Sequence, residues 1–161
     1  MIVVTGLPGS GTTLLMRMLE AGGVPVLHEP DHHPADARHP HGRYEIDLAS
    51  FAPSQSTSNH AVRIVDVDLD CCPAGEHKYL IATRDCREIA ESLSVTTAEA
   101  WGRQAALIDR CHPAVTIHYS SAILRPDHTT QRITTFLGGN LDAAAMRAAI
   151  DPSLWHHRAV Q

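Results

Sequence analysis

The sequence lacks a long apolar run. No segment approaches the roughly 18 consecutive apolar residues of a membrane-spanning helix. The first residues also lack the basic and then apolar pattern of a secretory signal peptide. We therefore expect a cytoplasmic protein without a membrane partner.

Basic residues are few as well. Lysine and arginine together number 13 against 18 acidic residues, Lys78 is the only lysine, and the formal net charge is −5. A protein that binds DNA or RNA needs a basic face to neutralise backbone phosphates. The composition argues against a nucleic-acid partner but is compatible with a small anionic ligand in a local pocket.

Cysteine is scarce, and its spacing matches neither a zinc ribbon nor a Cys-x-x-Cys redox pair. This favours buried free thiols at Cys71, Cys72, Cys86 and Cys111. Clustered histidines leave a metal site as an alternative, although their spacing is not that of ligands on a helix or hairpin. These five histidines are His28, His32, His33, His39 and His41. We expect a polar surface loop there and no metal.

Short apolar runs alternate with helical patterns along the chain. With 161 residues, 43% of them hydrophobic, the chain can bury one core, so we expect a single domain over residues 1–161. The alternation predicts an α/β fold of three layers, with a mostly parallel central sheet of about five strands. Strands are expected at residues 2–4, 24–27, 62–65, 79–82 and 115–117. Helices are expected at residues 12–21, from about 87, and at 97–110, 128–137 and 142–150.

Residues 28–60 are the least regular part of the sequence, with four prolines and a polar patch at residues 54–59. Long irregular segments in compact domains tend to be functional or disordered. We expect a lid-like segment that closes over a substrate.

The first predicted strand ends in a glycine-rich loop, residues 6–13, that opens the first helix. Gly6 and Gly11 keep the spacing of a P-loop, in which backbone N–H groups converge on a phosphate at a helix N-terminus. Nucleotide-hydrolysing P-loops continue with Gly-Lys-Ser/Thr, whereas this chain continues with Thr12 and Thr13 after Gly11. The sequence therefore predicts a P-loop fold that binds phosphate without the usual lysine.

A second phosphate signal follows the fourth predicted strand. Arg84 ends that strand, and Ser92 lies eight residues later on the next helix. Ligands of doubly wound sheets bind at the carboxyl ends of the strands, so both side chains are expected beside the glycine-rich loop. A guanidinium with a neighbouring hydroxyl suits a terminal phosphate, and a surface ion pair of Arg84 with Asp85 or Glu88 is the structural alternative.

With these two elements in this order, the chain resembles the P-loop sulfotransferases, and in particular short bacterial sulfotransferase-like proteins. Further similarity covers residues 18–27, 39–45 and 136–142, and so extends over most of the chain. The resemblance implies an enzyme that transfers a sulfonate group from 3'-phosphoadenosine 5'-phosphosulfate (PAPS) to a hydroxyl or amine, leaving 3',5'-ADP. It also implies no metal requirement.

The resemblance assigns roles to the residues of both elements. The 5'-phosphosulfate would be held by the loop residues Pro8, Gly9, Ser10, Gly11, Thr12 and Thr13, and the 3'-phosphate by Arg84 and Ser92. For the base that activates the acceptor, it favours Glu29, with His28 as the alternative.

The chain departs from the family at Gly9, where a lysine or arginine is usual. We consider Arg17, Arg43 and Arg103 as replacements for that cation. Two other functions stay open: a 3',5'-ADP-binding protein that no longer catalyses transfer, and a kinase-like phosphotransferase. We expect the acceptor to be a small molecule or glycan. The short connection between the last two strands is compatible with a site completed by a second copy of the chain.

Overall fold

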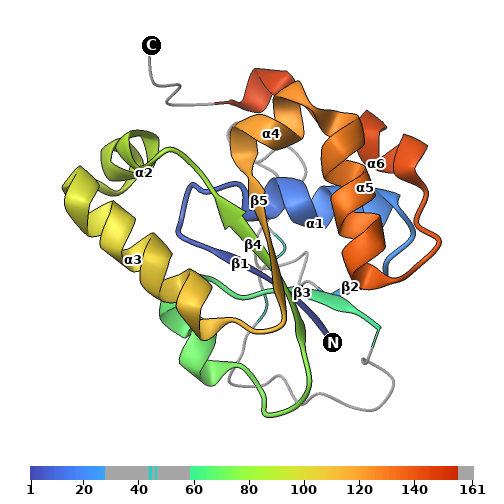
Figure 1. The fold of residues 1–161 in the computed structure, drawn as a ribbon, viewed down its shortest axis with the longest axis horizontal. Coiled ribbons are helices and arrows are strands. Elements are labelled where there is room, and N and C mark those ends of the chain that lie inside the picture. Colours follow the sequence, from blue (N-terminus) through green and yellow to red (C-terminus); the bar gives the residue numbers. More distant parts are fainter. Residues whose placement is uncertain (28–43, 45, 47–58, 156–161) are drawn as a thin grey trace.

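The computed structural model describes residues 1–27, 44, 46 and 59–155 (Figure 1). The predicted lid-like segment falls almost entirely outside these ranges. Glu29, Arg43 and the five clustered histidines, which include His28, also lie outside these ranges.

Five parallel strands form the central sheet, in the order β2-β3-β1-β4-β5. They span Ile2–Gly6 (β1), Val26–Leu27 (β2), Ala61–Arg63 (β3), Lys78–Thr83 (β4) and Ala114–His118 (β5). In the centre of the sheet, Val4 pairs with Arg63 on one side and with Leu80 on the other. The predicted α/β fold is confirmed, and the sheet is parallel throughout.

Helices cover both faces of the sheet, which makes the three layers visible in Figure 1. One face carries α1 (Thr12–Ala21), α4 (Tyr119–Leu124), α5 (Pro126–Leu137) and α6 (Ala143–Ala148). The other carries α2 (Cys86–Leu93) and α3 (Thr97–Arg110). Two 3-10 helices complete the described elements, η2 (Asp66–Cys71) and η3 (Pro152–Leu154).

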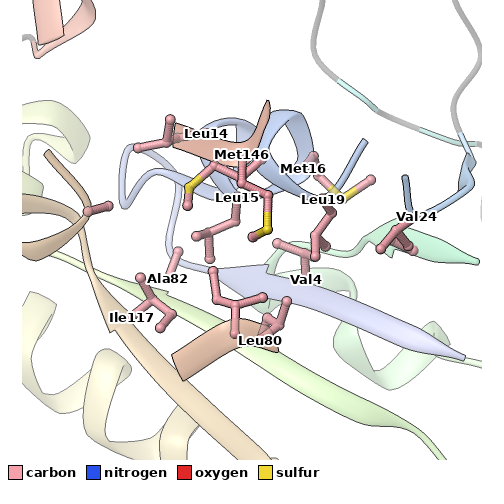
Figure 2. Packing of buried hydrophobic residues seen from close by; sticks show 14 of the residues in the cluster. Val4, Leu14, Leu15, Met16, Leu19, Val24, Leu80, Ala82, Ile117 and Met146 are labelled. Carbon is pink, nitrogen blue, oxygen red and sulfur yellow. The ribbon is translucent and has the colours of Figure 1, made fainter. Parts of the chain in front are cut away.

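Alternation along the strands divides the core between the two faces. Val4 and Leu80 point toward α1, whereas Val3 and Ile81 join Leu107 of α3 on the opposite face. Figure 2 shows Leu15 and Leu19 of α1 packed over the strand residues. Each fully buried aliphatic side chain contributes about 1.5–3 kcal/mol, so this packing fixes α1, and with it the N-terminus of α1, against the sheet.

Three short elements were not predicted. α4 has only six residues and begins directly after β5, without the glycine or proline that marks most boundaries. The two 3-10 helices, of six and three residues, are too short to show a hydrophobic period. The helix expected from residue 128 begins at Pro126, because proline is well tolerated in the first turn.

The cysteines are only partly as expected. All four are free thiols, but Cys111 alone is buried, and Cys71 at the end of η2 is exposed. The reason is that Leu69, and not Cys71, carries the buried contact of this turn.

The exposed fractions predict the order in which the thiols react with a maleimide. Cys71 is expected to label first and Cys111 only on unfolding, because Cys111 is covered and burial raises the pKa of its thiol, which reduces the reactive thiolate. Mass spectrometry of peptides after timed labelling gives the order, and Cys71→Ser should remove the fast phase. Equal rates at Cys71 and Cys111 would contradict the packing of α3 against the sheet.

No helix in the described ranges combines the length and the apolar character needed to cross a membrane.

Candidate anion-binding site

The glycine-rich loop lies at the carboxyl end of the central strand and leads into α1. Its turn is closed by a hydrogen bond from the Ser10 N–H to the Leu7 carbonyl, at 3.0 Å. Gly9 and Gly11 adopt φ angles of 82° and 104°, in the left-handed region that side chains disfavour. The glycines therefore allow the main chain to turn sharply at the entrance of the helix.

The N-terminus of α1 has no side-chain cap from its N-cap residue. The first N–H groups of a helix have no intrahelical acceptor, the N-cap Gly11 has no side chain to supply one, and the first turn holds no acidic residue. Ser10 is fully buried, and its hydroxyl has no hydrogen-bond partner within the described part of the chain. Unsatisfied donors and the positive end of the helix dipole together favour an anion here.

Tyr119 at the start of α4 forms one wall of the loop. A Cβ atom added at Gly11 would lie 2.4 Å from the Tyr119 ring. The ring therefore packs directly on the loop backbone, and only glycine fits between them.

Ser92, the other residue predicted for the second phosphate element, lies next to Gly9. A Cβ atom added at Gly9 would lie 2.8 Å from the Ser92 hydroxyl. The exposed hydroxyl on α2 is thus brought next to the loop. The same contact leaves little room for the basic side chain that the resemblance would place at position 9.

Arg63 brings a cation that the sequence did not reveal. It ends β3, next to β1 in the sheet, and its Nε donates a hydrogen bond to the Thr12 hydroxyl at 2.9 Å. The sequence pattern places it within the apolar strand predicted at residues 62–65. The signal available in the sequence was one charged residue within an otherwise apolar run. The guanidinium lies at the N-terminus of α1, the place where the loop itself lacks a charge.

Arg84 points at the loop and is 93% buried, since its exposed fraction is 7%. Its Nη1 donates to the Gly9 carbonyl at 2.9 Å, and its Nε donates to a carboxylate oxygen of Glu88. The guanidinium also lies over the Tyr119 ring, 4.9 Å from the centroid. The ion pair with Glu88 exists, but it is buried and not at the surface as the structural alternative assumed.

The end of the described chain joins this network. Trp155 Nε1 donates to the same Glu88 oxygen at 3.2 Å, and its ring meets Tyr119 edge to face, with centroids 5.8 Å apart. The Tyr119 hydroxyl donates to the Leu154 carbonyl at 3.3 Å. Residues 154 and 155 thus contact Tyr119 and Glu88, the two side chains that surround Arg84 next to the loop.

Asp85, between Arg84 and α2, has a separate role. Its carboxylate accepts from the Arg87 N–H at 2.8 Å and from the Arg87 side chain, which together lower its pKa to about 2. Asp85 therefore caps α2 as a carboxylate and holds Arg87 away from the loop.

The structure also places the other candidates. Thr13 and Pro8 are partly exposed in the loop. Arg17 is on α1 and lines a shallow hollow with Glu20 and Tyr44, whereas Arg103 is bound to Asp66 at 2.7 Å. Lys78 is the first residue of β4 and therefore lies at the opposite end of the strands from the loop. It donates to the Leu137 carbonyl at 2.9 Å.

No cluster of three His, Cys, Asp or Glu side chains suited to a metal ion occurs among the described residues.

A scan against protein-family models and a search of curated proteins both find no match for this chain.

Proposed function

We propose that the protein transfers a sulfonate group from PAPS to a hydroxyl or amine of a small-molecule or glycan acceptor. The main support is the N-terminus of α1, where Gly11 supplies no side-chain cap and the buried Ser10 hydroxyl has no hydrogen-bond partner among the described residues. These features favour binding of an anion, and the sequence resemblance to P-loop sulfotransferases suggests that this anion is a phosphosulfate. Arg84 and Ser92, the residues proposed for the 3'-phosphate side, both approach Gly9.

In this proposal the loop binds the 5'-phosphosulfate through the N–H groups of residues 11–13 and the hydroxyls of Ser10 and Thr12. During transfer, negative charge grows on the oxygen that bridges sulfur and phosphorus. Fixed donors and a nearby cation stabilise that charge. Arg63 is our candidate for this cation, in place of the side chain that Gly9 lacks. Glu29, or else His28, remains the proposed base for the acceptor proton.

A second function is favoured by one observation at Gly9. The neighbouring Ser92 hydroxyl restricts the space for a cation at this position, and a protein that binds 3',5'-ADP without transferring sulfonate would need no such cation. Nucleotide binding is common to both functions, and turnover separates them.

Thermal unfolding with added nucleotide tests the binding step. A ligand present at about 100 times its Kd stabilises the folded state by about 2.7 kcal/mol, which for a domain of this size raises Tm by roughly 5–10 °C. We expect PAPS and 3',5'-ADP to give this rise and ATP with magnesium to give a much smaller one. If neither PAPS nor 3',5'-ADP raises Tm at millimolar concentration, both functions are contradicted.

Radiolabelled PAPS then tests transfer. Incubation with phenol, alcohol, amine and sugar acceptors is expected to move the label to one class of acceptor. Tight 3',5'-ADP binding without label transfer to any of them would favour the binding protein.

A further inference from the structure

The Arg84 guanidinium already has a carboxylate partner. Glu88 lies one helical turn further along the chain, is 5% exposed and accepts the Arg84 Nε–H. A buried cation next to a buried anion presents little net charge to a ligand several ångströms away, because the two fields nearly cancel. Arg84 is therefore poorly suited to supply positive charge to a bound phosphate.

The second contact of Arg84 is with the main chain of the loop. Nη1 donates to the Gly9 carbonyl at 2.9 Å. Gly9 has a φ of 82°, and because glycine has no side chain, its backbone can adopt many other conformations. A charged donor on that carbonyl fixes the peptide between Gly9 and Ser10. The orientation of this peptide sets the position of the buried Ser10 hydroxyl and the approach to the N-terminus of α1.

We propose that Arg84 is a positioning residue of the glycine-rich loop and does not contact the bound anion. Glu88 holds the guanidinium, and the guanidinium holds the Gly9 carbonyl. This inference rests on the proposed anion site, and it leaves Ser92 as the member of the predicted pair that touches the 3'-phosphate.

Tyr119 and Trp155 support the same arrangement. The Tyr119 ring lies under the guanidinium and against Gly11, and the Trp155 N–H shares the Glu88 carboxylate. The guanidinium thus contacts the loop, Glu88 of α2 and Tyr119 of α4, and Trp155 contacts the last two. A side chain fixed on this many sides suits a positioning role, since a ligand contact would require it to leave part of this packing.

Two nucleotides separate positioning from direct contact. Both 5'-AMP and 3',5'-ADP carry the 5'-phosphate, so the ratio of their Kd values measures the contribution of the 3'-phosphate alone. Arg84→Lys and Glu88→Gln keep side-chain volume, and calorimetry gives both Kd values for each variant. We expect the Kd of both nucleotides to rise by about tenfold in each variant, as for loss of one hydrogen bond to a charged group. The ratio of the two Kd values should stay unchanged.

A change of the ratio would overturn the proposal. The ratio is taken as the Kd of 5'-AMP divided by the Kd of 3',5'-ADP. If Arg84 binds the 3'-phosphate, Arg84→Lys lowers this ratio, and Glu88→Gln raises it by releasing the guanidinium. Arg87→Lys and Glu91→Gln, on the exposed side of α2, are the matched controls and should leave both Kd values unchanged.

A second measurement needs no nucleotide, so it remains decisive if the proposed function fails. The carbonyl carbon of Gly9 is expected to shift in the NMR spectra of Arg84→Lys and Glu88→Gln, while that of Gly23 stays in place. An unmoved Gly9 signal in folded variants would overturn the positioning role. Absence of nucleotide binding together with a shifted Gly9 signal would leave the positioning of the loop supported and the proposed function contradicted.

Discussion

An Arg63→Ala variant is expected to lose about a hundred- to a thousandfold in kcat for sulfonate transfer, as when one preorganised donor is removed from a developing negative charge. The reason is the position of its guanidinium, which is bound to the Thr12 hydroxyl at the N-terminus of α1, next to a loop without a lysine. Because the helix N-terminus stays in place, the KM for PAPS should change much less. Initial rates at saturating donor measure the loss.

Arg103→Ala is the control for general effects of charge, because Arg103 pairs with Asp66 and not with the loop. Arg63→Lys should recover part of the rate, since it keeps the charge but not the planar set of donors. If Arg63→Ala keeps a rate within about threefold of the unmodified protein, the cation has to come from another residue.

A Gly11→Ala variant should lose about 3 kcal/mol in free energy of unfolding, and with it the affinity for the adenosine bisphosphates. Two causes act together. The residue has a φ of 104°, which costs a side chain roughly 1–2 kcal/mol, and its Cβ would lie 2.4 Å from the Tyr119 ring, an overlap that costs about 1–3 kcal/mol to relieve. Denaturant unfolding and calorimetry measure the two losses.

Gly23→Ala separates these causes. Gly23 has a φ of 91° but nothing within 4 Å of an added Cβ, so this variant should show the backbone cost alone and bind nucleotide normally. Equal destabilisation of the two variants would mean that the Tyr119 ring moves aside without cost. Tyr119→Ala is destabilising by itself, because the ring is buried. In a Tyr119→Ala background, however, Gly11→Ala should cost less than in the unmodified protein, because the overlap is gone and only the backbone strain remains.

The sequence was sufficient for elements with a strong local signal. The first helix was predicted with its observed bounds because Gly11 precedes it and Gly22 follows it, with apolar residues at helical spacing between them. Each strand was found from its apolar run, and the parallel sheet from the alternation with helices. Short helices such as α4, which pack against the core but are too short to show a hydrophobic period, were not predicted.

The candidate site was predictable as a set of segments but not as a set of contacts. The loop, Arg84 and Ser92 were chosen from motifs, and the fold brings them together at Gly9. The partners of Arg63 and Trp155 are 51 and 67 residues away in the sequence. Contacts over such separations depend on the order of the strands, which a single sequence does not reveal.

The central position of β1 has a consequence for how the protein is made. This strand leaves the ribosome before either of its neighbours, since β3 and β4 begin at residues 61 and 78. Until both have been synthesised, its edges stay unpaired, and such edges readily associate with other chains. The nascent chain must therefore keep β1 apart from other polypeptides until β4 has been synthesised.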